Sequence, residues 1–441
     1  MNASTDDHGG VLNALVRGDW VEPGTGERRT IPIDDIVIRD SLEGLEADLV
    51  MARHPGQSLI VVSDPHTHTA LGERVHRALA RAGADVREYV WEHPMCSSRG
   101  VETIREATAG RDALIAVGSG TVNDTVKYAC YLDGRAYSVF PTSPMSAYTT
   151  ATASVTFDGF KRSITCRGAR GVFYDLSVLA NCPPRLISAA FADVVCRTTA
   201  QVDWLLSHLL FGTAYVETPY ALLRIDEGEM IARAGDMRSG DHEALALLTR
   251  IAAIMGLGTA FAETTHSGSM HEHMISHYID MFAGEAHPGT SHGEQVGVAT
   301  VTMSALQNDV FGRERPPVMH ATEIPEETLR ARHPPEVADN LIAQSRAKAL
   351  SAEEADALNG RLEREWPAIR RRVTDLMLPH EELLRAMRAA GCQTTATELG
   401  LAPDVYRDAV LNARWTRDRF GTLDLVGDSG GLEPFVRTLA V

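Results

Sequence analysis

The chain has 441 residues, of which 44% are hydrophobic, and it carries a formal net charge of −17 at pH 7. A chain of this length exceeds what one hydrophobic core supports, so we expect two domains. The negative charge argues against nucleic acids and anionic membranes as partners, because surfaces that bind phosphate chains are basic. The composition therefore predicts a protein that acts on a small molecule or on another protein.

The six cysteines are widely scattered and form no CxxC pair. They indicate neither a disulfide framework nor a zinc ribbon, and they fit the reducing cytoplasm. No apolar run reaches the length of a transmembrane helix, and residues 1–20 lack the basic start and apolar block of a signal peptide. We therefore predict a cytoplasmic location.

Strand and helix patterns alternate along the first part of the chain. Residues 1–29 are polar and rich in glycine, and we expect a flexible arm there. Strand patterns separated by helical patterns follow, which predicts a β-α-β arrangement. Strands are expected at residues 31–38, 58–64, 85–91 and 113–117, with helices at residues 41–54 and 71–84.

The strand expected at residues 113–117 runs into Gly118, Ser119 and Gly120 and directly into a helix that begins near Val122. A strand, a glycine turn and a helix N-terminus place backbone N–H groups and the positive helix end where a pyrophosphate can bind. The stretch lacks the GxGxxG spacing of the common dinucleotide fingerprint and the lysine of a P-loop. By itself it is a weak indication of nucleotide binding.

Another strand is expected at residues 136–144, and alternation in residues 151–165 predicts a β-hairpin that turns at Asp158 and Gly159. From about Pro184 onward strand patterns fade and helical patterns continue to the C-terminus. We therefore predict three parts: a flexible arm at residues 1–29, an α/β domain at residues 30–183 and a helical domain at residues 184–441.

Histidine is concentrated in residues 263–300. Apolar residues around the sequence HEHMISH recur at helical spacing, which places His273 and His277 on one face of a helix and His271 elsewhere. Residues 289–291 break this helix, and a second helical pattern begins near His292, so imidazoles of the two helices can approach each other. Such a group suits zinc, iron or nickel, and packed core histidines are the alternative.

Asp193 lies in an apolar helical stretch, among alanine, valine and phenylalanine residues. A carboxylate in such surroundings is costly to bury unless it is paired or bound to a metal. Asp193 is therefore a candidate third ligand beside two histidines, and a capping or ion-pairing role is the alternative.

Several motifs in one order make the chain resemble the sn-glycerol-1-phosphate dehydrogenases, which belong with iron-type alcohol dehydrogenases, glycerol dehydrogenases and dehydroquinate synthases. The motifs are GSGTVND, PTSP, TFDGFK, FADVV, EHMISH and HGEQVGVATV, and the likeness extends from about Ile31 to the C-terminal region. The resemblance implies an α/β, Rossmann-like N-terminal domain and an all-α C-terminal domain. It also implies that NAD(P) and one divalent metal ion occupy a cleft between the two domains.

Matched to the motifs of this family, the metal ligands fall on Asp193, His273 and His292. His277, one turn beyond His273, is placed to line the pocket and to assist proton movement, with packing as the alternative. The residues that the resemblance assigns to the cofactor are Asp64, Gly118, Ser119, Gly120, Thr121, Asp124 and Thr142.

The resemblance implies a homodimer that interconverts an alcohol and a ketone or aldehyde. The implied substrate is glycerol 1-phosphate or dihydroxyacetone phosphate, or a related phosphorylated or phosphonate compound. The chain departs from the family where members commonly have PTAPSMDG, since residues 141–148 are PTSPMSAY and the aspartate that contacts the substrate is missing near Ala147. Arg197 stands where lysine is frequent, and extra residues before EHMISH leave His271 as an alternative to His273.

Three other functions compete with the dehydrogenase. A metal- and NAD-dependent lyase or cyclase like dehydroquinate synthase shares the architecture, and the missing aspartate raises a non-catalytic binding relative. The HxH of His66 and His68 is typical of metal-dependent amidohydrolases. That motif opens a β/α barrel, which the helical second half contradicts, so we favour the metal-dependent NAD(P)-linked dehydrogenase.

Overall fold

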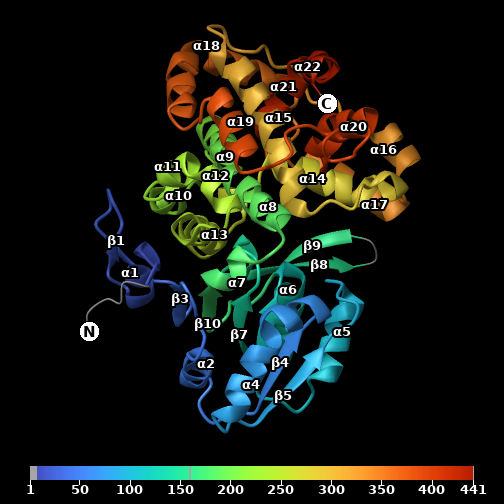
Figure 1. Ribbon diagram of the computed structural model, residues 1–441. Coiled ribbons are helices and arrows are strands. Elements are labelled where there is room, and N and C mark those ends of the chain that lie inside the picture. The colour runs from blue at the N-terminus through green and yellow to red at the C-terminus, as the bar shows by residue number, and fades with distance from the viewer. Residues whose placement is uncertain (1–6, 158–159, 441) are drawn as a thin grey trace. The chain divides into compact units, whose positions relative to one another are not determined.

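The computed structural model describes residues 7–157 and 160–440. By compactness the chain divides into two units, Met1–Val194 with Glu217–Thr264, and Val195–Val216 with Thr265–Val441. The first unit contains a parallel sheet with flanking helices, and the second is helical (Figure 1). An α/β part followed by a helical part is the architecture that the sequence predicted, so the fold class is confirmed.

Six parallel strands form the sheet, in the order β3-β10-β7-β6-β4-β5. The central strands β4 and β6 are continuous apolar runs in which every residue is buried. Such runs are typical of a parallel sheet that helices cover on both faces. The strands are β3 (Asp35–Arg39), β4 (Leu59–Ser63), β5 (Val86–Val90), β6 (Ala113–Gly118), β7 (Ala136–Pro141) and β10 (Gly171–Asp175).

Two pairs of helices cover this sheet. Helices α2 (Glu46–Arg53) and α4 (Glu73–Arg81) pack against each other, as do α5 (Ser98–Ala107) and α6 (Gly120–Asp133). Helix α4 also contacts β5, whereas α6 contacts β6 and β7. Alternate side chains of β4 and β6 pack into one core with α2 and α4, so the intervening side chains face the opposite layer.

The strand order reverses between β4 and β6, which pair directly, with Val62 opposite Ala116. After β4 the next strand, β5, lies toward one edge of the sheet, and after β6 the next strand, β7, lies toward the other edge. Ligands of open α/β sheets bind outside the carboxyl ends of the strands at such a reversal. Here Asp64 follows β4 and the loop Gly118–Gly120 follows β6.

Strands β8 (Thr152–Phe157) and β9 (Phe160–Thr165) form an antiparallel hairpin. The N–H of Thr156 donates to the carbonyl oxygen of Cys96 over 3.0 Å, which ties the hairpin to the segment before α5. The predicted hairpin is confirmed, and its predicted turn at Asp158 and Gly159 lies outside the described residues.

The N-terminal segment that we expected to be a flexible arm contains regular structure. Helix α1 (Val11–Arg17) buries Leu12 and Leu15, and the short strands β1 (Trp20–Val21) and β2 (Arg28–Arg29) pair with each other. The guanidinium of Arg250 donates to the carbonyl oxygen of His8 over 2.9 Å. The predicted domain limits, 1–29, 30–183 and 184–441, remain a prediction.

The remaining chain is helical, as predicted from about Pro184 onward. Short helices α3 (Pro65–Thr67) and α7 (Leu176–Ala180) precede this part. The other helices are α8 (Pro184–Val195), α9 (Arg197–Phe211), α10 (Thr218–Leu223), α11 (Glu227–Ala232), α12 (Ala234–Arg238), α13 (His242–Ala262), α14 (His271–Phe282), α15 (His292–Gly312), α16 (Glu326–Arg332), α17 (Pro335–Arg346), α18 (Ala352–Thr374), α19 (His380–Ala389), α20 (Pro403–Asn412), α21 (Thr422–Asp428) and α22 (Leu432–Thr438).

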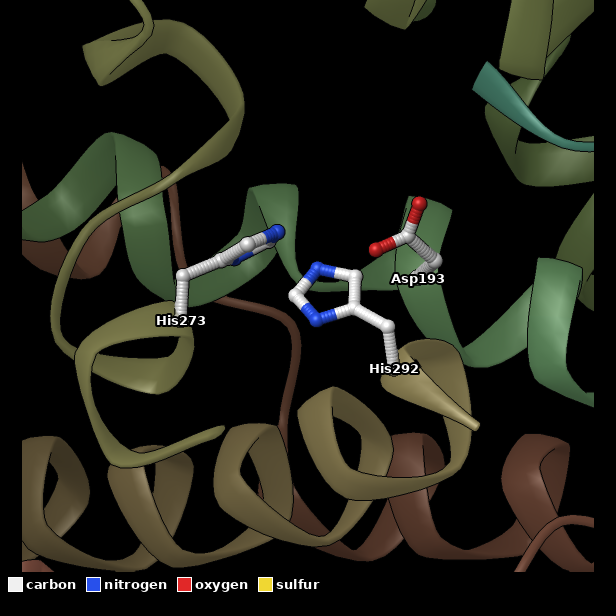
Figure 2. A group of neighbouring side chains, drawn as sticks. All are labelled: Asp193, His273 and His292. Carbon is white, nitrogen blue, oxygen red and sulfur yellow. The ribbon is translucent and has the colours of Figure 1, made fainter. Parts of the chain in front are cut away.

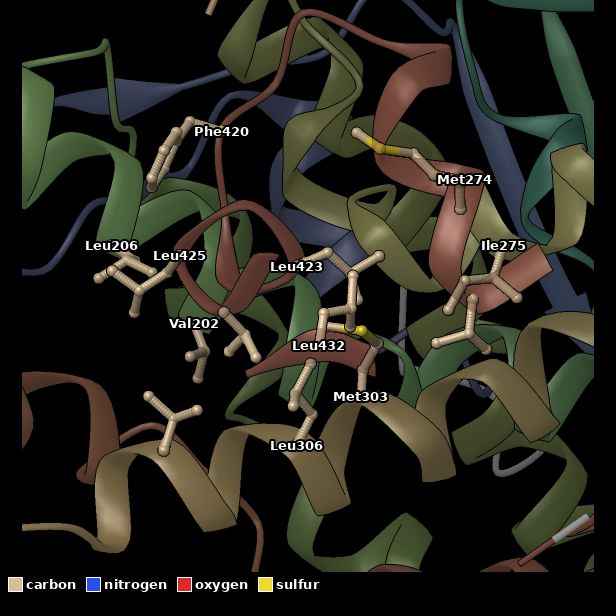
Figure 3. Close-up of a cluster of buried hydrophobic side chains, with 14 of the residues drawn as sticks. Val202, Leu206, Met274, Ile275, Met303, Leu306, Phe420, Leu423, Leu425 and Leu432 are labelled. Atoms are coloured by element: carbon tan, nitrogen blue, oxygen red, sulfur yellow. The ribbon is translucent and has the colours of Figure 1, made fainter. Parts of the chain in front are cut away.

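The core of the second unit is built from helices that are distant in sequence (Figure 3). Val202 and Leu206 of α9 belong to the same buried cluster as Ile275 of α14, Leu306 of α15 and Leu423 of α21. Burial of each such side chain contributes about 1.5–3 kcal/mol. This packing holds α14 and α15, which carry the clustered histidines, against a fixed support.

Helix α13 is long and apolar enough to cross a membrane by length and composition, but most of it is buried inside the structure. The core helix of a globular protein passes the same test. Our expectation that the chain has no apolar run of that length is therefore wrong for α13.

Asp175 offers a test of how the sheet is fixed to the segment before α2. It is fully buried, accepts a hydrogen bond from the Leu42 N–H over 3.0 Å, and pairs with Arg74. Burial by itself raises the pKa of Asp175, but hydrogen bonds from Ser177 and the Leu42 N–H, with the charge of Arg74, hold it below its ordinary value.

We expect Asp175→Asn to lower the free energy of unfolding by about 1–3 kcal/mol, because the neutral amide loses the charge that Arg74 and the hydrogen bonds stabilise, while Arg74 keeps its pair with Glu46. The lowered pKa means that the stabilisation is complete above the ordinary aspartate pKa of about 4 and is lost as the pH falls below it. Urea unfolding of both proteins between neutral and acidic pH measures this. A difference in stability that does not shrink toward acidic pH would contradict the assignment.

Candidate metal centre and dinucleotide loop

Three side chains from three helices form a group that suits a metal ion. Asp193 lies in the last turn of α8, His273 in the first turn of α14, and His292 at the first position of α15. Each offers one ligand atom, and these atoms all lie within 4.8 Å of one another. Figure 2 shows the carboxylate and the two imidazoles directed toward a common space. The sequence assigned the ligand role to these residues, and the structure brings them together.

Local sequence explains how the histidines reach this position. Ser291 and Glu294 form a capping box that starts α15, and the N–H of Ser291 donates to the Glu294 carboxylate over 2.6 Å. This cap places His292 at the first position of the helix. Asp193 lies two residues before the end of α8, and α9 begins at Arg197, directly after Cys196.

The donor set fits a divalent transition metal. One carboxylate oxygen and two imidazole nitrogens are the ligand types that zinc and iron take in sites where further positions remain for a substrate or water. Asp193 and His273 are buried and His292 is half-buried, so the group is largely screened from water. A buried carboxylate of this kind is costly without a cation or strong hydrogen bonds.

His277 flanks the group, as its helical spacing predicted. Its ring centroid lies 6.1 Å from that of His273 and 5.4 Å from that of His292, and it stacks against His292. This position fits its predicted part in proton movement, which remains a prediction.

His271 occupies different surroundings. It is fully buried, and its Nδ1 lies 2.8 Å from Asp203 while its Nε2 lies 3.2 Å from Asp424. Burial alone lowers the pKa of His271, but the two carboxylates raise it above its ordinary value. Because carboxylates contact both of its ring nitrogens, the geometry favours His273 over His271 as the ligand.

Ser146 lies beside the group and was missed by the sequence analysis. Its hydroxyl donates to Oδ2 of Asp193 over 3.2 Å, and it belongs to the loop after β7 in which the aspartate of the family is missing. The neighbouring Ala147 offers its carbonyl oxygen to Asn123 and to Lys127. Nothing in the sequence pattern indicated that this loop and Asp193, which lie 47 positions apart, would meet.

The glycine loop after β6 has the close packing that a phosphate-binding turn requires. A Cβ atom on Gly118 would lie 2.8 Å from Cβ of Val122, so this position needs glycine. Helix α6 begins at Gly120, and the side chain of Ser119 makes no capping hydrogen bond to it. The first N–H groups of α6 are therefore not capped by a side chain and can bind an anion.

Three other residues that the resemblance assigns to the cofactor have the following positions. The N–H of Thr142 donates to the carbonyl oxygen of Gly118 over 3.2 Å. Asp64 caps α3, accepting hydrogen bonds from the N–H groups of His66 and Thr67 over 2.9 and 3.0 Å. Thr121 lies in the first turn of α6. Their assignment to the cofactor remains a prediction.

Asp124 is held by groups of the protein itself. One of its oxygens accepts from Asn123 and from the fully buried Lys127, and the other accepts from the N–H of Ser154 over 2.9 Å. Lys127 also donates to the carbonyl oxygens of Ala147 and Thr152, each over 2.8 Å. This cluster fixes the loop after β7 against α6, a function that the sequence analysis did not foresee for either residue.

Comparison with known proteins agrees with this architecture. The family profile of iron-containing alcohol dehydrogenases matches residues 42–183. A glycerol-1-phosphate dehydrogenase (NAD(P)+) of Methanoculleus marisnigri is 31% identical over 283 residues, which cover 62% of this chain and 75% of that protein. The chain belongs to the iron-containing alcohol dehydrogenase family. Members of this family are oxidoreductases, so the predicted family and enzyme class are confirmed.

The likeness extends over nearly the whole chain. A second glycerol-1-phosphate dehydrogenase (NAD(P)+), from Bacillus velezensis, is 24% identical over 416 residues, covering 92% of this chain and 94% of that protein. The crystal structure of a probable glycerol dehydrogenase from Sinorhizobium meliloti covers 92% of this chain and 98% of its own, with a TM-score of 0.60 at 18% identity. The likeness to this solved structure supports the fold alone.

The competing hydrolase is not supported. Its HxH motif lies in α3 and the turn that follows, where His68 pairs with Glu88 over 3.0 Å. The strands of the described residues form an open six-stranded sheet and two small antiparallel pairs rather than a barrel.

Arg197, which stands where the resemblance leads us to expect a lysine, is buried and donates to Gln201 over 2.7 Å.

Gly256 of α13 gives a test of how the loop that carries Ser146 is positioned. A Cβ atom at Gly256 would overlap the carbonyl oxygen of Ser146 and the hydroxyl of Thr149. We expect Gly256→Ala to lower the free energy of unfolding by about 1–3 kcal/mol, because an overpacked site must displace the backbone.

Gly360 within α18 is the matched control, since a Cβ atom there meets only the guanidinium of Arg364 at 3.6 Å. Gly360→Ala is expected to raise the stability by about 0.5–1 kcal/mol through helix propensity. Chemical unfolding of both variants checks this. Equal effects of the two substitutions would show that α13 does not fix the loop.

Proposed function

We propose that this chain is a metal-dependent, NAD(P)-linked dehydrogenase that interconverts an alcohol and a ketone or aldehyde on a small phosphorylated or phosphonate compound. The favoured pair is glycerol 1-phosphate and dihydroxyacetone phosphate, since relatives of 24–31% identity carry that name. The observation that carries the proposal is the convergence of Asp193, His273 and His292 within 4.8 Å. We further propose a homodimer in the cytoplasm.

The residues of the chain have separate parts in this reaction. Asp193, His273 and His292 would hold the divalent cation, with zinc, iron and nickel as candidates. A bound cation supplies Lewis acidity toward the oxygen of the substrate, and a bound nicotinamide supplies or accepts hydride. When the carbonyl carbon takes up hydride its oxygen takes up a proton, and His277 stands beside the group to deliver it.

The sheet supports a dinucleotide at the strand reversal. The uncapped N-terminus of α6 and the tight turn at Gly118 would bind the pyrophosphate. The side chain of Asp64, at the end of the neighbouring strand, would accept a hydrogen bond from the adenosine ribose. The backbone of Thr142, which is hydrogen-bonded to Gly118, would border the same site.

Alanine substitutions of the three ligands test the metal and the reaction together. We expect Asp193→Ala, His273→Ala and His292→Ala each to lower zinc content and to lower kcat/KM for dihydroxyacetone phosphate reduction by more than about 100-fold, since even residues behind a ligand contribute 10–100-fold. Metal analysis and oxidation of NADH or NADPH measure the two quantities. His242→Ala, which alters a carboxylate-paired histidine outside the group, is the control.

The same assay separates the competing functions. Net consumption of reduced nicotinamide during turnover contradicts a lyase or cyclase, which returns the cofactor to its starting state. A wild-type protein that binds no divalent metal would instead support a non-catalytic relative, the function raised by the alanine at position 147.

Asp64 allows a test of cofactor choice. A carboxylate beside the ribose repels the 2′-phosphate of NADP, so we expect the wild type to prefer NADH to NADPH. Asp64→Ser keeps a residue that can cap α3 and is expected to narrow that preference by about tenfold or more. Steady-state kinetics with both cofactors measures it, and a preference that Asp64→Ser leaves unchanged would remove Asp64 from the cofactor site.

A further inference from the structure

We infer that Glu272, Ser276 and Gln295 are positioning residues that hold His273 and His292 in the one tautomer in which Nε2 of each ring can bind a cation. This inference rests on the proposed metal centre. Figure 2 shows the ring nitrogen farther from the main chain of each histidine facing the space that the two rings share with Asp193. The nearer nitrogen, Nδ1, must then carry the proton, and the groups that contact Nδ1 decide whether it does.

Glu272 determines which ring nitrogen of His273 carries the hydrogen. Its carboxylate is fully buried, and Oε1 lies 3.0 Å from Nδ1 of His273. An ionised carboxylate accepts hydrogen bonds only, so Nδ1 of His273 carries the hydrogen and Nε2 carries the lone pair. The same Oε1 accepts from the N–H of Met270 over 2.7 Å, which fixes the carboxylate at the start of α14. A carboxylate behind a ligating histidine also makes it a stronger ligand.

A chain of hydrogen bonds between neutral groups determines which ring nitrogen of His292 carries the hydrogen. The hydroxyl of Ser276 lies 3.1 Å from Nδ1 of His292 and 2.9 Å from Oε1 of Gln295. The hydroxyl has one hydrogen, which it donates to Gln295, so it accepts a hydrogen bond from His292. Nδ1 of His292 is therefore protonated, as Nδ1 of His273 is.

The orientation of the Gln295 amide controls this chain. Its Oε1 faces Ser276, while its Nε2 lies 3.4 Å from the hydroxyl of Thr290 and 2.9 Å from Nε2 of His287. Nε2 of His287 also donates to Asp280 over 3.1 Å, so it competes for the amide oxygen of Gln295. With the amide reversed, Gln295 would donate to Ser276 and Ser276 would donate to His292. The proton of His292 would then move to Nε2, where it excludes a cation.

A second group of potential ligands lies next to the first and gives the main competing explanation. Cys196, Glu272 and His273 are all buried and offer ligand atoms within 4.8 Å of one another. If this group held the cation, Glu272 would be a ligand and not a positioning residue. Oε1 of Glu272 accepts from the N–H of Met270 and contacts Nδ1 of His273, and the hydroxyl of Thr199 contacts Oε2 over 3.3 Å, which favours the positioning role.

The test measures zinc affinity by competition with a chromogenic chelator, so that it does not depend on turnover. Glu272→Gln and Ser276→Ala are each expected to weaken zinc binding by about 10–100-fold, as residues behind metal ligands do. Gln295→Leu, which removes the acceptor of Ser276, is expected to weaken it similarly. Gln295→Glu keeps an acceptor at that position and is expected to retain wild-type affinity, a rescue that a purely structural role of Gln295 would not produce.

Two matched controls contain similar pairs outside the metal group. Asp203→Asn changes a buried carboxylate paired with His271 of the same helix α14. Ser304→Ala changes a buried serine of α15 whose hydroxyl lies 3.1 Å from Nδ1 of His380, the same distance as in the Ser276 pair. Both are expected to keep wild-type zinc affinity, and melting of each metal-free protein shows whether the variant is folded. If Glu272→Gln does not fold, the Ser276 and Gln295 variants test the same claim on His292.

The possible failures are distinguishable. Wild-type zinc affinity in Asp193→Ala would overturn the proposed metal centre itself. Loss of affinity in Asp193→Ala together with unchanged affinity in Glu272→Gln, Ser276→Ala and Gln295→Leu would overturn the positioning role and leave the centre intact. In the cobalt-substituted protein, a thiolate charge-transfer band that Cys196→Ser abolishes would place the cation at the second group and would also overturn the inference.

Discussion

A carboxylate and two imidazoles whose ligand atoms lie within 4.8 Å of one another, two of them buried and one half-buried, are the constraint on which the rest of this structure depends. Such a group is costly in a water-poor interior unless a cation or strong hydrogen bonds balance it. The surrounding fold offsets this cost with buried polar groups that contact the histidines. Glu272 and Ser276 are each fully buried, and each contacts the nearer nitrogen of one histidine.

The same physical rule separates His271 from the proposed metal ligands in this chain. His271 has carboxylates against both ring nitrogens, which makes it part of a closed network that also contains Lys348 and Asp424. His273 contacts one carboxylate through Nδ1 and turns its other nitrogen toward Asp193. Two histidines two positions apart on a helix thus have different surroundings because they point to nearly opposite sides of it.

The sheet provides the second constraint. Phosphate-binding turns form where the strand order reverses, and here that position lies between β4 and β6. The loop after β7 is fixed against this turn by Tyr148, whose hydroxyl donates to the carbonyl oxygen of Gly118, and by the buried Lys127. Ser146 of the same loop donates to Asp193, so one loop contacts both the glycine turn and a proposed metal ligand. In a dehydrogenase these two functions must be adjacent, because hydride passes directly between cofactor and substrate.

The sequence by itself predicted most strands and helices and a set of candidate metal ligands. Apolar runs such as residues 113–117 are strands because they can be buried on both faces, and helical spacing placed His273 and His277 on one face. The resemblance that ordered motifs carry then added Asp193 and His292 as expected ligands. The tertiary structure alone decided that Ser146 meets Asp193, that Asp124 pairs with Lys127, that Glu272 contacts His273 and that Gln295 contacts Ser276. Periodicity states which side of a helix a residue occupies, but what lies across from that side depends on the packing of segments far apart in the chain.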